Sequence, residues 1–194
     1  MYSLGKFKDL TSKYGEYSSW AVWDKNNLGN YSVINENIDK LHSKYVLLAL
    51  NLSGPLIDKP WGNFHYGPSN VRKIMYACDG TELWGAYMTD IFKGIVEQKS
   101  QKLNSLLTKE IIEENVKMFN QEMKDVGITK DTKFIVFGTT TSFLAQCFNK
   151  YFRQGFSNEV IYQNHYSYYG ITDKEWVESF WKKLGINRSL DLST

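Results

Sequence analysis

Apolar and polar positions along this chain follow two periods, one typical of β-strands and the other of α-helices. The clearest strand signal is YVLLALN, a continuous apolar run that is typical of a strand covered by helices on both faces. Four other short apolar runs also predict strands. The predicted strands are Ser19–Asp24, Tyr45–Asn51, Leu83–Thr89, Lys133–Phe137 and Glu159–Asn164.

Between these runs, apolar residues recur at intervals of three or four positions, which predicts amphipathic helices. The last helix begins Thr-Asp-Lys-Glu, a capping box in which Thr172 and Glu175 bond to free amide groups. The predicted helices are Pro68–Cys78, Thr108–Val126, Thr139–Phe152 and Thr172–Leu184. Strands that alternate with helices favour an α/β fold. We therefore expect a three-layer α/β/α sandwich around a central, mainly parallel sheet of four to five strands.

Length and composition are those of one globular domain. The chain has 194 residues, of which 42% are hydrophobic and 23% charged, and it contains no repeat or linker. We expect residues 45–184 to form the core and residues 1–44 to be an N-terminal capping segment.

No apolar run is long enough for a membrane span and no leader is evident, so we expect a cytoplasmic protein. Cys78 and Cys147 lie among apolar helical residues and are expected to be reduced, buried thiols.

Polar residues follow four of the predicted strands at the points where the strands end. In a parallel sheet the binding site lies beyond these carboxyl ends. Four polar ends that converge favour a pocket, although each alone is equally typical of a surface loop. The ends are Asn51-Leu52-Ser53, Thr89-Asp90, Gly138-Thr139 and Asn164-His165.

Each of these residues also has a structural interpretation. An asparagine that closes a strand commonly forms an Asx turn, and His165 could be a hydrogen-bonded structural histidine. Aromatic residues such as Phe64 and Tyr66 belong to the core more often than to a binding site. Asp90 is harder to explain structurally, because a carboxylate at the end of a buried strand needs a partner.

Several classes of function lack their sequence signals. His42 and His65 show no ligand-like spacing with Cys, Asp or Glu, so we expect no metal. The sequence has no glycine-rich phosphate loop of the Walker or dinucleotide type and no G-x-S-x-G segment, and we expect no cofactor. The net charge of +2 is small for a nucleic-acid-binding protein, whereas the aromatic content of 15% is compatible with a base-stacking pocket.

The four polar ends, taken in order, resemble the motifs of the uracil-DNA glycosylase superfamily. ALNLSG at 49–54 resembles the first motif of its mismatch-specific, thymine-DNA glycosylase-like branch, and NFHYGPSNVRKIMYA is similar to the segment that follows there. TDIFKG at 89–94 resembles a segment of the thermophile-type branch, and KFIVFGTTTSFLAQ resembles a late strand, glycine and helix of the family. NHYSYYG at 164–170 resembles the closing His-Pro-Ser motif. Order and spacing agree over roughly residues 45 to 184.

This resemblance implies a DNA glycosylase that acts on a flipped damaged or mismatched base, uracil or a deaminated base, in base-excision repair. It implies that Asn51 places a water molecule and that His165 stabilises the departing base, both as catalytic residues. The implied base contacts are Phe64, Asp90, Ser53 and Tyr66. The implied DNA contacts are Ser167, Tyr168, Tyr169, Lys93 and Thr139, with Arg72 and Lys73 as further candidates for phosphate contacts. An ordinary solvated helix face is the alternative for the three basic residues. The expected partner is DNA and not a membrane, and we expect a monomer.

Three residues depart from the family pattern. Leu52 and Tyr166 stand where the family usually has proline, and Asp90 stands where the thermophile-type branch has asparagine. An ionised aspartate only accepts hydrogen bonds, which suits a base that presents donors, whereas a protonated one also donates. Two further functions stay open: a catalytically weak relative that binds nucleic acid or a nucleotide, and a hydrolase of small N-glycosides.

Overall fold

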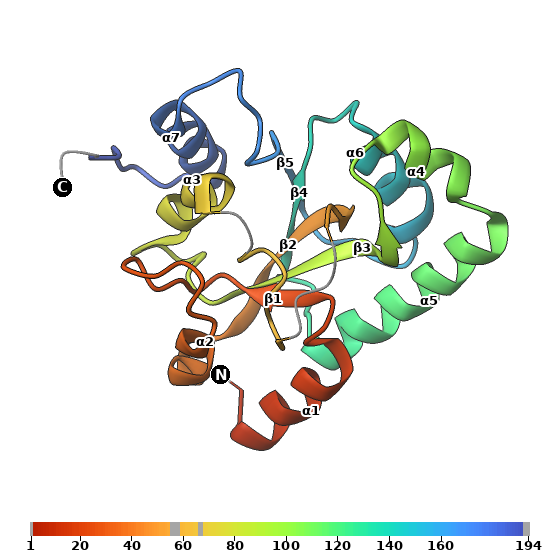
Figure 1. Cartoon of the computed structure of the whole chain (residues 1–194), viewed down its shortest axis with the longest axis horizontal. Coiled ribbons are helices and arrows are strands. Elements are labelled where there is room, and N and C mark those ends of the chain that lie inside the picture. The colour runs from red at the N-terminus through yellow and green to blue at the C-terminus, as the bar shows by residue number, and fades with distance from the viewer. Residues whose placement is uncertain (1, 55–58, 66–67, 192–194) are drawn as a thin grey trace.

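A five-stranded sheet forms the centre of the protein, which a computed structural model describes over residues 2–54, 59–65 and 68–191 (Figure 1). The strands lie in the order β1-β3-β2-β4-β5. β3, β2, β4 and β5 run parallel to one another, and β1 pairs antiparallel with β3 at one edge. The strands are β1 (Ser18–Trp20), β2 (His42–Leu52), β3 (Ala86–Val96), β4 (Lys133–Phe137) and β5 (Val160–Gln163).

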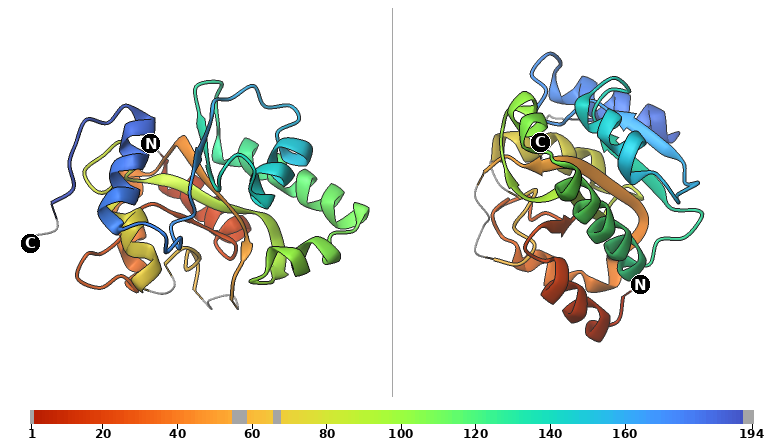
Figure 2. Two further views of the ribbon diagram at one scale, coloured as in Figure 1. Left: turned by 90° about the horizontal axis from the view of Figure 1, so that it is seen from above. Right: turned by 90° about the vertical axis from the view of Figure 1, so that its right-hand side faces the viewer.

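Helices cover both faces of this sheet. Figure 2 shows α3 and α7 on one side of the strands and α5 and α6 on the other. The helices are α1 (Leu4–Tyr14), α2 (Ser32–Glu36), α3 (Pro68–Cys78), α4 (Ser100–Leu106), α5 (Lys109–Val126), α6 (Phe143–Cys147) and α7 (Asp173–Leu184). A 3-10 turn, η1 (Ile38–Lys40), precedes β2, and a π-helical turn, η2 (Phe148–Phe152), continues α6. The predicted three-layer α/β/α sandwich is confirmed.

The apolar run of β2 is central because it has a neighbour on each side and a helical layer on each face. Leu48 pairs with Thr89 of β3 and with Val136 of β4, and its side chain is fully buried. Aromatic rings fill the space between β4, α5 and η2 on one face. On the other face, Phe137 of β4 packs against Trp176 and Phe180 of α7. Continuous hydrophobicity is therefore required on this strand.

The ends of the long helices follow the signals in the sequence. Thr108 accepts a hydrogen bond from the amide of Ile111 and so caps α5, which ends at Gly127 in a left-handed conformation. Thr172 and Glu175 form the predicted capping box of α7. Cys78 and Cys147 are both buried and form no disulfide, as predicted.

The third strand differs most from its predicted range of Leu83–Thr89. β3 begins at Ala86 and continues to Val96, because the preceding residues form a tight turn that packs against the end of η1. Gly85, with φ of 90°, leaves no room for a side chain beside the carbonyl group of Lys40. Asp90 therefore lies inside the strand, opposite Ala49 of β2, and not at its carboxyl end.

Two other predicted elements are shorter than expected. The first strand, predicted as Ser19–Asp24, is reduced to β1, which ends at Trp20. The helix predicted as Thr139–Phe152 begins only at Phe143, because Ser142 is the residue that caps α6 by accepting from the amide of Ala145. Thr139 remains in the loop after β4, where its hydroxyl lies 3.3 Å from that of Thr141.

Three helices, α1, α2 and α4, were not predicted. α1 packs against α5, and its Tyr14 hydroxyl donates to the Asp125 carboxylate at 2.7 Å. The N-terminal segment thus adds a helix and an edge strand to the sandwich. Within the described residues, no helix is both long and apolar enough to cross a membrane.

Candidate functional site

Asn51 lies near the carboxyl end of β2, where its amide group joins this strand to the end of β3. Its Nδ2 atom donates to the carbonyl oxygens of Leu52, Ile95 and Glu97 at 2.9, 3.2 and 2.8 Å. The pairing of β2 with β3 shifts register immediately after Asn51, so these bonds stabilise an irregularity. The amide nitrogen is committed to the backbone. The side-chain oxygen of Asn51 is the atom that could place a water molecule, and this role stays a prediction.

His165 lies in the loop after β5, and its neighbours determine where its proton sits. The backbone N–H of Ser167 donates to His165 Nδ1 at 3.2 Å, and the Ser167 hydroxyl lies 2.7 Å from the same atom. Because a backbone N–H can only donate, Nδ1 accepts and the neutral ring carries its hydrogen on Nε2. Burial lowers the pKa of His165 to about 4. The ring is therefore a neutral hydrogen-bond donor at physiological pH.

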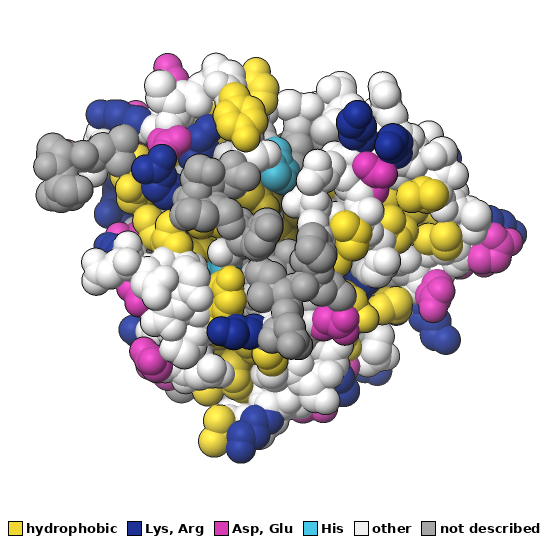
Figure 3. Space-filling model, viewed as in Figure 1, with side chains coloured by type: hydrophobic (Ala, Val, Ile, Leu, Met, Phe, Trp, Pro, Cys, Tyr) yellow, Lys and Arg dark blue, Asp and Glu magenta, His cyan; other side chains and the backbone are white. Residues whose placement is uncertain are grey.

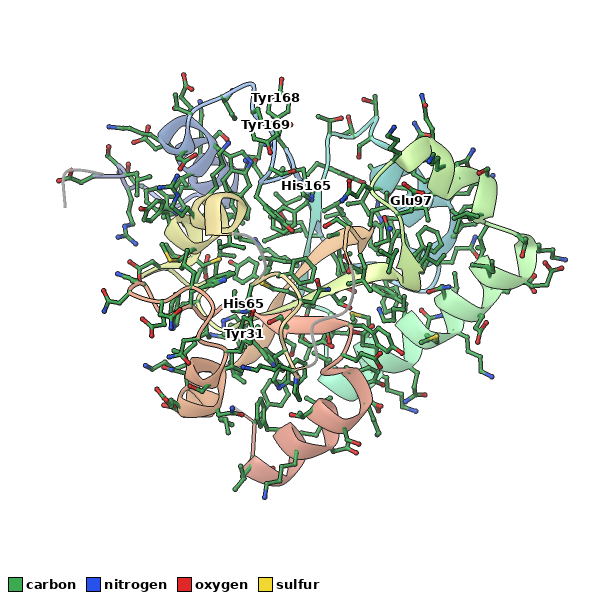
Figure 4. All side chains as sticks on the ribbon, viewed as in Figure 1. Tyr31, His65, Glu97, His165, Tyr168 and Tyr169 are labelled. Atoms are coloured by element: carbon green, nitrogen blue, oxygen red, sulfur yellow. The ribbon has the colours of Figure 1, made fainter. Side chains whose placement is uncertain are left out.

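The loop that carries His165 reaches the surface. Tyr168 and Tyr169 at its tip are 51% and 89% exposed. Figure 4 shows both tyrosines beyond His165 at the upper edge of the molecule. In Figure 3, a histidine side chain is visible at the surface in the region where Figure 4 labels His165. An exposed aromatic tip is thus adjacent to a half-buried imidazole.

Lys73 of α3 holds this loop from inside the protein. Its Nζ atom donates to the carbonyl oxygens of Tyr168 at 2.7 Å and Ile171 at 3.2 Å, and lies 3.8 Å from the Asp173 carboxylate. Lys73 is buried, whereas its neighbour Arg72 is exposed. This placement leaves the Lys73 ammonium without the exposure that a phosphate contact needs, and only Arg72 of this pair has it.

Asp90 is buried in β3, where the described residues place one side-chain donor, Asn63, on its carboxylate. Asn63 Nδ2 donates to Asp90 Oδ2 at 2.9 Å. Asp90 is only 3% exposed. Burial raises the pKa of Asp90 to about 7, and the charge of Glu122 acts in the same direction. The hydrogen bond from Asn63 and the charge of Lys93 oppose this shift. The group therefore titrates near neutral pH.

Lys93 belongs to a buried polar network and not to a surface. Its ammonium lies 2.7 Å from the Glu122 carboxylate of α5 and donates to the Asp90 carbonyl oxygen at 2.6 Å. The hydroxyl groups of Tyr87 and Thr89 also donate to Glu122, each at 2.8 Å. With a side chain only 2% exposed, Lys93 lacks the access that the predicted phosphate contact requires. It also lies on a strand and not on a solvated helix face.

Phe64 lies in a turn whose backbone is unusual. Both Phe64 and Trp61 have positive φ angles, 65° and 68°, which bulky residues rarely adopt. The Phe64 amide donates to Asn63 Oδ1 at 3.0 Å. Phe64 itself is 4% exposed and packs in the hydrophobic core. Its ring is thus covered in this structure, and stacking on a base stays a prediction that requires the ring to be uncovered.

Two further predicted residues, Ser53 and Thr139, lie in loops that follow strands of the sheet. Ser53 after β2 and Thr139 after β4 are both exposed at the edge of the sheet where the parallel strands end. Tyr66 lies outside the described residues. The loops after β4 and β5 both lie at the upper edge of the view in Figure 1.

Tyr166 follows His165 in the loop after β5 and stacks on it. Its ring stacks on His165 with centroids 4.2 Å apart and planes inclined by 28°. Burial raises the pKa of Tyr166, and the nearby charge of Asp90 raises it further. The charge of Asp90 thus acts on the loop after β5, although β3 and β5 are separated in the sheet by β2 and β4.

Three contributors were not recognised from the sequence in these roles. Asn63 orients Asp90, Tyr166 stacks on His165, and Lys73 holds the loop. The only sequence signal for Asn63 is its place before an aromatic residue in a turn-like WGNFHYG segment. Asn63 and Asp90 are 27 residues apart, and Lys73 and Tyr168 are 95 residues apart, so no spacing rule could have paired them. Tyr166 directly follows His165, but only the conformation of the loop stacks the two rings.

A groove of about 900 Å³ lies elsewhere, between α1 and α5, where it is lined by residues that include Tyr14, Tyr17, Lys93 and Lys117. Among the described residues that line it, Lys93 is the only predicted site residue. Two of its lining residues contact the network around Asp90: Lys93 donates to the Asp90 carbonyl oxygen, and the Tyr17 carbonyl oxygen accepts from Asn63. Among the residues that the structure describes, no group of three His, Cys, Asp or Glu side chains is arranged to hold a metal ion.

Comparison of the chain with protein-family models, curated proteins and solved structures finds no match. The functional argument therefore rests on the chemistry of the site.

Proposed function

We propose that this protein is a DNA glycosylase that hydrolyses the N-glycosidic bond of a damaged or mismatched base flipped out of DNA. The observation that carries the proposal is the state of His165. Its Nδ1 atom is occupied by Ser167, so that a neutral Nε2–H group is left as a donor beside an exposed loop tip.

Such a donor suits the chemistry of base release. When the N-glycosidic bond breaks, the sugar gains oxocarbenium character and the electron pair of the bond moves to the base. A preorganised donor aimed at the developing negative charge lowers the barrier, and it acts most strongly where water is excluded. His165 remains neutral at physiological pH because burial lowers its pKa to about 4. The Nε2 atom of His165 thus carries a hydrogen at physiological pH and can donate it in a hydrogen bond when the base departs.

The loop tip suits entry into the DNA helix. Extrusion of a base costs a few kcal/mol, and stacking on an aromatic ring returns roughly 1–3 kcal/mol per base. Tyr169, at 89% exposed, is free to occupy the gap that the flipped base leaves. Lys73 restrains the backbone of this loop, which reduces the entropy that insertion would cost.

The proposal is tested with a panel of duplex and single-stranded oligonucleotides, each carrying one modified base. Wild-type protein is expected to release at least one of these bases. His165→Ala is expected to abolish that release while the fold remains intact. His42→Ala is the matched control. His42 is also half-buried, and burial lowers its pKa, but it lies at the amino end of β2, away from the carboxyl ends of the strands. Equal release by wild type and His165→Ala would remove His165 from the mechanism.

A protein that binds nucleic acid without cleaving it is the second candidate. Asn51, predicted to act in catalysis, and Asp90, predicted to contact the base, both make hydrogen bonds inside the protein. Binding to the panel without release of any base would favour this function. Release from free nucleosides but not from oligonucleotides would favour a hydrolase of small N-glycosides.

A further inference from the structure

We propose that Tyr166 is the positioning residue of His165: its ring, stacked on the imidazole, holds the plane in which the Nε2–H group donates to the departing base. This inference deepens the glycosylase function proposed above and rests on that function for its chemical role. The stacking itself is a property of the folded chain. It can therefore be measured whether or not the protein releases a base.

Tyr166 and His165 are neighbours in sequence, and a turn brings their rings together. In a strand, successive side chains point to opposite faces of the sheet. After β5 the chain turns back, because the amide of Tyr168 donates to the carbonyl oxygen of His165 at 2.9 Å. Within this turn the two ring centroids lie 4.2 Å apart, and the ring planes are inclined by only 28°. The rings therefore meet face to face.

A hydrogen bond on the edge of the imidazole and a ring on its face restrain different motions. The Nδ1 atom of His165 accepts from the backbone amide of Ser167, which fixes the edge that carries this atom. One such bond leaves the ring free to tilt about the bonded atom. The stacked ring of Tyr166 blocks this tilt. Both restraints together fix the direction of the Nε2–H group before a base arrives, and a donor acts most strongly when it is preorganised in this way.

Tyr166 is supported by the hydrophobic core through Phe137, the last residue of β4. The ring of Phe137 meets that of Tyr166 edge to face, with centroids 5.2 Å apart and planes inclined by 86°. Phe137 is buried and packs in turn against Trp176 of α7. The stacked pair therefore rests on a strand of the central sheet and on the helix that covers it.

The two ends of the turn are held by helices. The carbonyl oxygen of Asn164, just before the histidine, accepts from Nε1 of Trp176 in α7 at 2.8 Å. The carbonyl oxygen of Tyr168, at the end of the turn, accepts from Lys73 of α3 at 2.7 Å. Because both ends of the backbone are held, the remaining freedom lies in the imidazole ring itself. That is the freedom which the stacked ring removes.

Two substitutions separate the ring of Tyr166 from its hydroxyl group. Tyr166→Phe keeps the stacked ring and is expected to release base at close to the wild-type single-turnover rate. Tyr166→Leu keeps an apolar side chain without the ring, and its rate is expected to fall about 10-fold or more while oligonucleotide binding changes little. An equal loss in both variants would assign the effect to the hydroxyl group and overturn the positioning role. A wild-type rate in Tyr166→Leu would overturn it as well.

Tyr162→Leu is the matched control. Tyr162 belongs to β5 and is also half-buried. Its hydroxyl group donates to Asn149 of η2 at 2.9 Å, whereas Tyr166 packs on the side of the sheet that α7 covers. This variant removes a tyrosine ring just before the same loop, and it is expected to leave base release in place.

NMR of His165 measures the stack without any substrate. Protons above the face of an aromatic ring resonate upfield, so the ring protons of His165 are expected to move downfield in Tyr166→Leu. They are expected to stay nearly in place in Tyr166→Phe and Tyr162→Leu. The imidazole nitrogen-15 signals are expected to move toward the average of the two tautomers only in Tyr166→Leu, because the tilted ring leaves the Ser167 amide. Unchanged His165 signals in Tyr166→Leu would overturn the positioning role.

The two measurements distinguish failure of the inference from failure of the function. If the NMR signals behave as expected but wild type releases no base from any oligonucleotide or nucleoside, Tyr166 holds the imidazole and the glycosylase function alone fails. If wild type releases a base and Tyr166→Leu releases it equally fast, the glycosylase function stands and the positioning role fails.

Discussion

His165 shows how single neighbours decide the chemistry of a residue. The amide of Ser167 selects the tautomer, and burial removes the charge that a free histidine carries below pH 6.5. The residue type is visible in the sequence, but the hydrogen on Nε2 follows from a loop geometry that only the folded chain defines.

The first prediction concerns this tautomer. His165 is expected to have an unprotonated Nδ1 and a protonated Nε2 at pH 7, and to remain neutral until the pH approaches 4. Nitrogen-15 NMR of the imidazole groups measures both properties. His42→Ala and His65→Ala identify the other two histidine signals. A His165 midpoint near 6.5 would contradict the described burial.

The second prediction concerns the buried pair of Lys93 and Glu122. Removal of one partner leaves an unpaired buried charge, so Lys93→Met is expected to lower the free energy of unfolding by about 3–5 kcal/mol. The double variant Lys93→Met with Glu122→Gln is expected to lose less than the sum of the two single variants. Urea denaturation of the four proteins measures this difference, and strict additivity would show that the pair is not coupled.

At the scale of elements, helix α3 and the β5–α7 loop act as one unit. Lys73 of α3 bonds to two carbonyl oxygens of the loop, and α3 packs directly on α7. The pattern of apolar residues predicted α3 correctly because Val71, Ile74, Met75 and Cys78 lie on one helical face and are all buried. From the sequence, Lys73 was a candidate phosphate contact or part of a solvated helix face, and both interpretations require an exposed side chain. The structure buries it, because a helical period assigns a face but does not show what lies opposite that face.

The third prediction tests this connection. Lys73→Met is expected to free the loop of residues 165–171, because it removes charge-assisted hydrogen bonds worth roughly 1.5–3 kcal/mol each. Amide hydrogen exchange in the loop is expected to become faster. Arg72→Met is the control, since Arg72 neighbours Lys73 on α3 but is exposed. Equal exchange rates in the two variants would show that Lys73 does not restrain the loop.

β3 is the clearest case in which the sequence predicted a strand correctly but gave the wrong first and last residues. An apolar run beginning at Leu83 continued into Thr89 and Asp90, which resembled the polar end of a strand. In the structure the strand continues because its polar residues have partners: Glu122 satisfies Thr89 and Asn63 satisfies Asp90. A polar residue therefore ends a strand only where no buried partner is available, and partners are not visible in a local pattern.

At the scale of the whole molecule, buried titratable groups make stability depend on pH in two opposing ways. His65 and His165 have pKa values lowered to about 4, so the folded state binds fewer protons than the unfolded chain between pH 6.5 and 4. Their contribution to stability is present above pH 6.5 and is lost as the pH falls through 4. Asp90, with its pKa raised to about 7, acts oppositely: its contribution is present below pH 4 and is lost as the pH rises through 7.

The fourth prediction separates these contributions. Asp90→Asn removes the term that favours the folded state as the pH falls, while the histidine terms remain. The free energy of unfolding is therefore expected to fall more steeply between pH 7.5 and pH 5 in Asp90→Asn than in wild type. Urea denaturation at both pH values measures this, and each unit of pKa difference corresponds to about 1.4 kcal/mol. Parallel losses in the two proteins would mean that Asp90 is not protonated more readily in the folded state.

The sequence by itself determined the α/β class, the apolar strands β2 and β4, and the caps of α5 and α7, because these depend on local period and on residues three or four positions apart. It also singled out His165 and Asp90 as residues in need of an explanation. Only the tertiary structure decided the contacts: Asn63 with Asp90, the stacking of Tyr166 on His165, and Glu122 with Lys93. Most of these partners come from different elements of the sandwich. Their contacts depend on sheet order and register, which arise from packing of the whole chain and leave no local pattern in its sequence.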